Sequence, residues 1–191
     1  MAQELELKFA ATEAQLEQIL ARLEGFTQTR METTYYDTRD RRLSAAKITL
    51  RCRRENDLRI CTVKTPGKGL ARGEWECESD EIETAIPILC KLGAPRELLT
   101  LPDLIPVCGA KFTRLSRLLT LPDAQIELAL DRGVLLGGGK EAPLCEVELE
   151  LKSGSEETLV ALAEAIAREF SLSPEPKSKF ARAMQLTVDN G

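Results

Sequence analysis

Two segments that lie far apart in this sequence alternate charged and apolar residues in the same way. Residues 4–9 read Glu-Leu-Glu-Leu-Lys-Phe, and residues 145–151 read Cys-Glu-Val-Glu-Leu-Glu-Leu. Because successive side chains of a β-strand point to opposite faces, each segment predicts a strand with charges on one face and apolar groups on the other. If the two strands meet in one sheet, their carboxylates form a site for a hard divalent cation.

The same alternation recurs along the chain and predicts about eight strands, most of them antiparallel. Further strands are expected at residues 33–37, 47–54, 61–64, 72–78, 111–121, 125–131 and 146–152, with a glycine-rich hairpin at 133–139. An amphipathic helix is expected after the capping box that begins at Thr12, and a second one after Ser155. Shorter helices are expected near residues 82–92 and 177–182.

Amphipathic helices need an apolar sheet surface to cover, and this requirement orients the strands. We therefore predict an α+β fold, an eight-stranded antiparallel β-barrel or tunnel with a charged interior and helices packed on the outside. The residues expected on the exterior of the barrel are Leu5, Leu7, Val63, Trp75, Leu128, Leu130, Val147 and Leu149. A sandwich whose charged faces are simply solvated is the alternative that the alternation leaves open.

The charge and the residue types exclude several classes of function. The formal net charge of −5, from 26 basic and 31 acidic residues, argues against a non-specific nucleic-acid binder. The sequence contains no histidine, which excludes Ser-His-Asp triads and histidine-based acid–base catalysis. Proton transfer must then fall to Glu, Asp, Lys or Tyr side chains.

The apolar segments and the cysteines indicate a cytoplasmic location. No apolar run approaches membrane-spanning length, and the charged start does not resemble a signal peptide, so we expect no membrane partner. The cysteines show no C-x-x-C pair of the kind that binds zinc or forms thioredoxin-like redox sites. We expect small buried hydrophobic residues in a reducing cytosol at Cys52, Cys61, Cys77, Cys90, Cys108 and Cys145.

Several short motifs occur in the order that is typical of one protein family. Residues 4–8 match an ExExK signature, and further matching blocks lie at residues 35–38, 50–53, 63–64, 72–74, 125–127, 145–150 and 178–179. On these residues the chain resembles the CYTH superfamily of triphosphate tunnel metalloenzymes, and within it the CYTH domain of bacterial inorganic triphosphatases. The resemblance implies a single CYTH domain over residues 1–191, without the helical CHAD domain that bacterial members often carry.

The resemblance also implies a role for individual residues, with Mg²⁺ or Mn²⁺ as the cofactor. The triphosphate oxygens would be bound by Lys8, Arg51, Arg53, Lys64, Arg72, Arg114, Lys177, Lys179 and Arg182. The metal ions would be held by Glu4, Glu6, Glu146, Glu148 and Glu150. The catalytic group would comprise Glu4, Glu6, Lys8 and Tyr36, with Tyr35 as the alternative tyrosine. A secondary acidic set comprises Glu74, Glu76, Glu127 and Asp131.

One detail of this assignment stays open at the sequence level. Arg114 and Arg117 fall on opposite faces of an unbroken strand, so they cannot both point into a tunnel. The alternation does not say which of the two faces inward.

The function expected from these features is metal-dependent hydrolysis of inorganic triphosphate to pyrophosphate and phosphate, with a small-molecule triphosphate as the partner. The first alternative is another triphosphate chemistry: thiamine triphosphatase, nucleoside triphosphatase or class IV adenylate cyclase. The chain has only five Phe, two Tyr and one Trp, which disfavours a pocket for a nucleotide base. The second alternative is a non-catalytic polyphosphate-binding module. A monomer or a homodimer is expected.

Overall fold

The computed structural model describes residues 2–67 and 71–188, with side chains described over 4–67 and 73–188. The strands in these ranges are β1 (Ala2–Ala10), β2 (Thr27–Thr38), β3 (Thr49–Glu55), β4 (Leu58–Thr65), β5 (Ala71–Glu78), β6 (Leu104–Thr120), β7 (Ala124–Gly137), β8 (Lys140–Gly154) and β9 (Ser173–Pro174). The helices are α1 (Glu13–Arg22), α2 (Arg42–Ala45), α3 (Ile82–Lys91), α4 (Glu156–Glu169), α5 (Lys179–Gln185) and the 3₁₀ turn η1 (Arg96–Thr100). No helix in the described ranges has the length and apolar character to cross a membrane.

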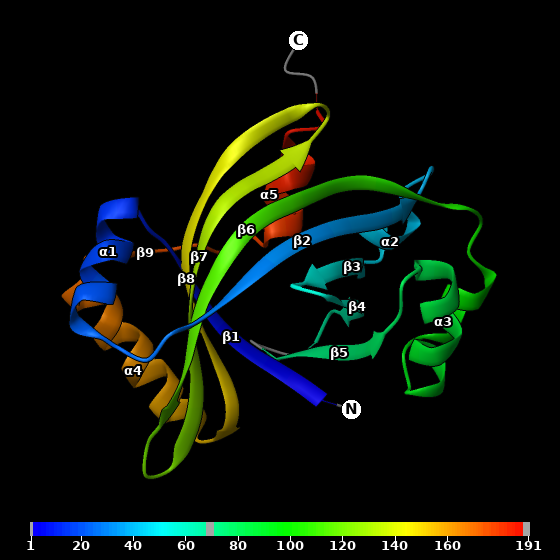
Figure 1. Ribbon diagram of the computed structural model, residues 1–191. Coiled ribbons are helices and arrows are strands. Elements are labelled where there is room, and N and C mark those ends of the chain that lie inside the picture. The colour runs from blue at the N-terminus through cyan, green and yellow to red at the C-terminus, as the bar shows by residue number, and fades with distance from the viewer. Residues whose placement is uncertain (1, 68–70, 189–191) are drawn as a thin grey trace.

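The eight longer strands form one antiparallel sheet that curves round on itself (Figure 1). Their order is β5-β4-β3-β2-β6-β7-β8-β1. The first strand bridges the two ends of this order, because β1 pairs with β8 over residues 6–10 and with β5 over residues 2–5. The predicted eight-stranded antiparallel fold is confirmed, and the two-residue β9 adds a short further pairing to β1.

The two alternating segments found in the sequence lie side by side in this sheet. Glu6 faces Glu150 and Lys8 faces Glu148 directly across the β1–β8 pair. Side chains opposite each other in an antiparallel pair lie about 5 Å apart at Cβ. The charges of both segments therefore project from the same face of the sheet, which is its inner face.

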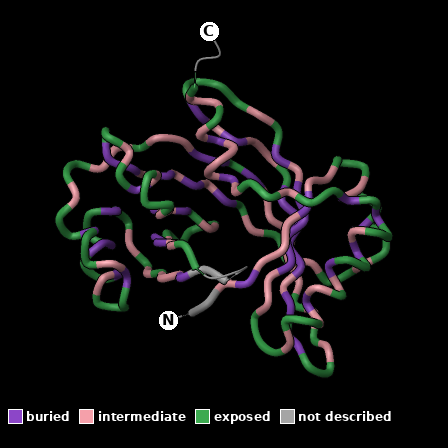
Figure 2. Tube along the Cα trace, turned by 180° about the vertical axis from the view of Figure 1, so that it is seen from behind, coloured by how far each residue is buried: buried purple, intermediate pink, exposed green. Residues whose placement is uncertain are grey.

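The outer face of the sheet is apolar and covered by helices, as predicted. Helices α1 and α4 cover β1, β7 and β8 with a cluster in which Leu128, Leu149 and Leu159 are fully buried. Helix α3 covers β3, β4 and β5 around Val63 and Leu50. Figure 1 shows these two helical layers on opposite sides of the barrel, and Figure 2 shows the buried segments following the strands.

Helix α5 packs differently, because it fills one end of the inner face. Its Ala183 is fully buried against a small apolar cluster that includes Phe112, Leu135 and Leu144. Phe112 and Leu144 precede Arg114 and the Glu146–Glu150 series on the same strand face. The interior is therefore apolar beneath α5 and charged beyond it, so α5 marks one end of the charged region.

The local signals for helix starts and for the long hairpin are confirmed. Thr12 Oγ1 accepts a hydrogen bond from Gln15 N–H, and Gln15 Oε1 accepts one from Thr12 N–H at 2.8 Å, which completes the capping box of α1. Ser155 Oγ accepts from Thr158 N–H at 3.1 Å at the start of α4. Gly138 and Gly139 take φ values of +57° and +73° in the β7–β8 turn, where such backbone geometry favours glycine.

The strand expected at residues 111–121 begins earlier in the structure than the alternation indicates. Strand β6 begins at Leu104 and runs past Pro106, opposite a β2 strand that begins at Thr27. Pro106 pairs with Tyr36 where the β2–β6 register shifts. A proline has no N–H to give to the ladder, and such a bulge accommodates it.

Helix α2 was not predicted, and a buried carboxylate explains it. The Asp37 side chain, fully buried, accepts hydrogen bonds from Leu43 N–H at 2.9 Å and from Ser44 N–H at 3.1 Å. Its Oδ2 also accepts from Ser44 Oγ at 2.6 Å. The acceptor and these donors are six or seven residues apart in sequence, so no helical periodicity signals the turn.

The interpretation of the cysteines needs one correction. Cys52 and Cys61 face each other across β3 and β4, with 4.1 Å between their Cα atoms, and form a disulfide. Directly opposed residues of an antiparallel pair lie close enough for such a bond. The other four cysteines are free. Cys77 faces Cys61 from the next strand, β5.

Candidate active site

The inner face of the barrel encloses a cavity of about 630 Å³. Thirteen of the residues predicted for the site line it: Glu4, Glu6, Lys8, Arg51, Arg53, Lys64, Glu74, Glu76, Arg114, Glu127, Glu148, Glu150 and Lys179. The structure thus brings together residues from seven of the eight long strands and from α5. The charged faces of these strands point inward rather than to bulk solvent, so the solvated sandwich is excluded.

Arg51 and Arg53 on β3 form the cationic wall of the cavity. Arg51 Nε is buried and has no hydrogen-bond partner among the described residues, and Arg51 Nη2 reaches Glu74 and Glu76 only at 3.9 and 3.8 Å. Burial, followed by repulsion from Arg51 and Arg114, lowers the pKa of Arg53 to about 10. Two crowded guanidinium groups with few close partners are suited to bind a phosphate anion.

Lys64 and Glu4 form a second charged group at the β1–β5 junction. Lys64 Nζ donates a hydrogen bond to Glu4 Oε1 and lies 3.2 Å from Glu74 Oε1. Burial raises the pKa of Glu4, but the charge and hydrogen bond of Lys64 outweigh it, so the pKa of Glu4 is lowered overall. Glu4 is therefore an ionised carboxylate next to the cationic wall.

Arg114 and Lys179 line the cavity but are held by carboxylates. Arg114 donates from Nε and Nη2 to Asp131 at 2.7 and 2.6 Å and also to Glu148. Lys179 Nζ lies 2.7 Å from both Asp131 and Glu148 and donates to Glu146 as well. These bonds also show that Arg114, rather than Arg117, is the arginine of β6 that points inward.

Arg117 points outward from the same strand. Its guanidinium donates to the Glu24 carbonyl and lies 5.9 Å from the centre of the Phe26 ring. Ser116 lines the cavity at the position between the two arginines.

Three carboxylates lie in register across β1, β8 and β7, and we call them the carboxylate row: Glu6, Glu150 and Glu127. Burial, and then the charge of Glu148, raise the pKa of Glu6 to about 8. The described cation nearest to Glu6 is Lys8, whose Nζ is 4.0 Å from Glu6 Oε1. A carboxylate held this far from the cations of the described residues, among further carboxylates, fits the hard oxygen-donor set of Mg²⁺ or Mn²⁺.

Asp131 and Glu146 were predicted for the site and lie one layer behind it. Both are fully buried, and one oxygen of each lies within 4.8 Å of an oxygen of Glu148. This buried cluster is already neutralised by Arg114, Lys179 and Arg182. Glu146 holds Lys179 and Arg182 in place and does not line the cavity, and its role as a metal ligand stays a prediction.

Three other predicted residues do not line the cavity: Tyr36, Lys177 and Arg182. Tyr36 shares the outward face with Leu50, its partner on β3, and packs into the cluster beneath α3. Tyr35 is the tyrosine that lines the cavity, with its ring 5.2 Å from that of Phe180. Lys177 is exposed and contributes its carbonyl, which accepts from Lys8 Nζ at 3.3 Å.

Arg182 and Arg72 complete the predicted set. The Arg182 guanidinium donates to the buried Glu146 and lies 3.7 Å from Glu175, so it belongs to the layer behind the cavity. Arg72 pairs with Glu4 through the β1–β5 register, but its side chain lies outside the described residues.

The sequence reasoning missed several lining residues that the same alternation could have found. Lys152 follows Glu150 by two positions on β8, and Glu55 follows Arg53 by two on β3, so both share the inner face. Ser178 and Glu175 also line the cavity from the segment before α5. No periodicity marks that segment, which reaches the cavity only because β9 and α5 fold back onto the barrel.

The fold and the site together define a class of protein: an antiparallel barrel whose interior carries cations and carboxylates around a cavity of the size of a small polyanion. The CYTH domain family matches residues 2–184. The chain therefore belongs to the CYTH family.

Curated proteins and solved structures are similar to this chain. The inorganic triphosphatase of Haemophilus influenzae is 33% identical over 190 residues, which cover 94% of this chain and 54% of the relative. The chain thus spans about half the length of the curated relative that it matches.

Two solved structures share the fold. A protein from Pyrococcus horikoshii has a TM-score of 0.64 and 23% identity, with 96% of this chain and 99% of that chain covered. A putative adenylyl cyclase from Hippeastrum, described as having a dominant triphosphatase activity, has a TM-score of 0.65 and 18% identity, with 100% and 98% covered. At these identities the likeness shows the fold alone.

Proposed function

We propose that the cavity binds a triphosphate and hydrolyses it with the help of a divalent metal ion, with inorganic triphosphate as the substrate and pyrophosphate and phosphate as the products. The observation that carries the proposal is that Arg51 and Arg53 share one cavity with Glu6, Glu148 and Glu150. Membership of the CYTH family and the likeness to a relative named inorganic triphosphatase support it.

The charge balance of the cavity supports the need for a metal ion. The described lining side chains include nine carboxyl groups and seven cations, so the acidic groups outnumber the cations. A triphosphate adds several more negative charges to a half-enclosed space, where unpaired charges cost several kcal/mol each. Divalent cations held by Glu6 and Glu150 would supply the positive charge that offsets this repulsion.

The cationic wall and the carboxylate row have different roles in the proposed reaction. Arg51 and Arg53 hold the non-bridging oxygens at one end of the triphosphate and stabilise the charge that the leaving pyrophosphate gains. Glu6 and Glu150 orient the attacking water, and a carboxylate oxygen of Glu6 takes up its proton. A bound metal ion supplies Lewis-acid polarisation of the phosphoryl oxygens. Lys179 and Arg114 keep Glu148 in position through the contacts described above.

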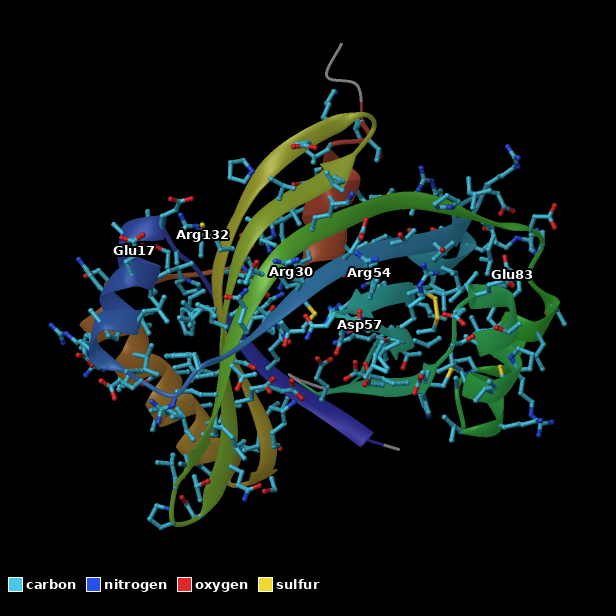
Figure 3. All side chains as sticks on the ribbon, in the orientation of Figure 1. Glu17, Arg30, Arg54, Asp57, Glu83 and Arg132 are labelled. Atoms are coloured by element: carbon cyan, nitrogen blue, oxygen red, sulfur yellow. A yellow bond between two sulfur atoms is a disulfide. The ribbon has the colours of Figure 1, made fainter. Side chains whose placement is uncertain are left out.

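The direct test compares Arg51 and Arg54, two arginines of β3 whose side chains point to opposite faces of the sheet. We expect Arg51→Gln to raise the KM for triphosphate at least tenfold, about the 1.5–3 kcal/mol of a hydrogen-bonded ion. Arg54→Gln is the matched control, because Arg54 is exposed and pairs with Glu32 at 3.3 Å on the outside of the barrel (Figure 3). Phosphate release would be measured with Mg²⁺, with Mn²⁺ and with a chelator.

The outcome of this assay decides between the proposal and its rivals. Equal KM values for the two variants would contradict the assignment of Arg51. Turnover of thiamine triphosphate or ATP in preference to inorganic triphosphate, or formation of cyclic AMP, would replace the substrate. Tight triphosphate binding without any release would leave a polyphosphate-binding module. A cytoplasmic location stays a prediction from the sequence.

A further inference from the structure

Lys152 is a cation next to the carboxylate row that the proposed reaction does not use. It lies on β8 two positions after Glu150, on the inner face, and lines the cavity. Its Nζ is 2.9 Å from Glu150 Oε1 and 3.5 Å from Glu127 Oε1. One ammonium group thus spans two of the three carboxylates of the row.

The strand register explains why a cation is needed at this position. Glu6 faces Glu150 across β1 and β8, and Glu150 faces Glu127 across β8 and β7. Like charges directly opposite each other in an antiparallel pair are destabilising. The contacts of Lys152 offset this repulsion for Glu150 and Glu127 when no other cation is bound.

The ammonium group of Lys152 can also move away from the carboxylate row. Its side chain is 39% exposed, whereas that of Lys179, which is enclosed by buried carboxylates, is 7% exposed. A lysine side chain with a long flexible stem can move its ammonium group to solvent while the stem stays in place. The same carboxylate oxygens are then free for another cation.

We propose that Lys152 is an internal counter-ion of the carboxylate row, which a divalent metal ion displaces from Glu150, so that Lys152 is a positioning residue that sets the metal affinity of the cavity. The inference rests on the proposed function in one respect, since it requires that a divalent cation binds at this row. Lys152 holds the carboxylates together without metal and competes with the metal when it arrives.

The direction of the effect separates this role from a merely structural one. If Lys152 only supported the fold around the row, its removal would loosen Glu150 and Glu127 and weaken metal binding. If Lys152 competes with the metal, its removal strengthens metal binding while the metal-free protein becomes less stable. The two roles therefore predict opposite changes in the dissociation constant of the metal.

The experiment measures Mn²⁺ binding to the full chain without substrate, by titration with detection of free Mn²⁺ by electron paramagnetic resonance. We expect Lys152→Met to bind Mn²⁺ about twofold to fivefold more tightly than the wild type, the range for the release of a partly exposed ion pair. Lys152→Arg, which keeps the charge, should return the dissociation constant close to the wild-type value. Thermal denaturation with a chelator should show a lower melting temperature for Lys152→Met.

Lys111→Met is the matched control, because Lys111 is exposed on β6 and pairs with Glu32 at 3.0 Å outside the cavity. Its Mn²⁺ affinity should equal that of the wild type. Unchanged or weaker Mn²⁺ binding by Lys152→Met would overturn the inference while leaving the proposed function intact, provided that the wild type releases phosphate from triphosphate with Mn²⁺. A wild type that binds no Mn²⁺ and releases no phosphate would overturn both.

Discussion

The raised pKa of Glu6 predicts that the metal-free protein loses stability as the pH rises, and that Glu6→Gln removes part of this loss. The carboxyl group ionises at its ordinary value of 4.5 in the unfolded chain and at about 8 in the folded one. Between these values the folded state binds more protons than the unfolded state, so the free energy of unfolding falls as pH rises. Glu6→Gln cannot ionise and should lack this contribution.

The size of the effect follows from the same values. A rise from 4.5 to about 8 corresponds to at most about 5 kcal/mol, at about 1.4 kcal/mol for each pH unit. The Glu6 side chain keeps 22% of its surface exposed, and solvent screening reduces the figure. We expect Glu6→Gln to gain about 1–2 kcal/mol over the wild type at pH 8 and almost nothing at pH 5, a rise of about 3–6 °C in Tm at the higher pH.

The assay is thermal or urea denaturation with a chelator at several pH values between 5 and 8. Glu164→Gln is the control, since it removes an exposed carboxylate on α4 that lies outside the cavity. Added Mg²⁺ should stabilise the wild type most at pH 8 and Glu6→Gln much less, because the variant has lost one anionic donor. A difference between Glu6→Gln and the wild type that stays constant with pH would refute the reasoning.

Two further changes test the parts of the structure that hold the cavity. Lys179→Met leaves three buried carboxylates without their shared cation and should cost about 3–5 kcal/mol of unfolding free energy, whereas Lys177→Met, on an exposed side chain two residues away, should cost less than about 0.5 kcal/mol. Equal costs in urea denaturation would show that the network around Lys179 is not stabilising. Replacement of Cys52 and Cys61 together by Ala should lower the unfolding free energy by up to about 3 kcal/mol, from the loop closed by a bond with a sequence separation of 9. The same midpoint with and without a reductant in the wild type would contradict it.

The fold and most of the lining residues could be predicted because successive side chains of a strand point to opposite faces of the sheet. The inner positions of β1, β3 and β8 alternate strictly, and Glu6, Arg51 and Glu148 are read directly from that pattern. The prediction differs from the structure on the neighbouring strand β2, where Tyr35 rather than Tyr36 lines the cavity. Tyr36 has the parity of its outward partner Leu50 rather than that of Arg51, which only the β2–β3 register makes visible.

The division of the acidic residues between two layers could not be predicted in the same way. Glu146, Glu148 and Glu150 look equivalent in the sequence, yet Glu146 is fully buried whereas Glu150 lines the cavity. The difference arises because α5 folds over one end of the inner face and brings Lys179 to Glu146. Contacts between residues this far apart in sequence leave no periodic signal in either segment.

The closure of the barrel by its first strand has a consequence for the way in which the protein is made. β1 pairs with β8, and Lys8 Nζ donates to the Lys177 carbonyl across a sequence separation of 169 residues. Contacts of such long range slow folding, because the loop entropy is lost before the contacts form. The β3–β4 and β6–β7 hairpins can form as the chain leaves the ribosome, but the cavity cannot. Until β8 has been synthesised, β1 has no partner strand on that side. The charged side chains Glu4 and Glu6 then disfavour pairing of this exposed strand with other chains.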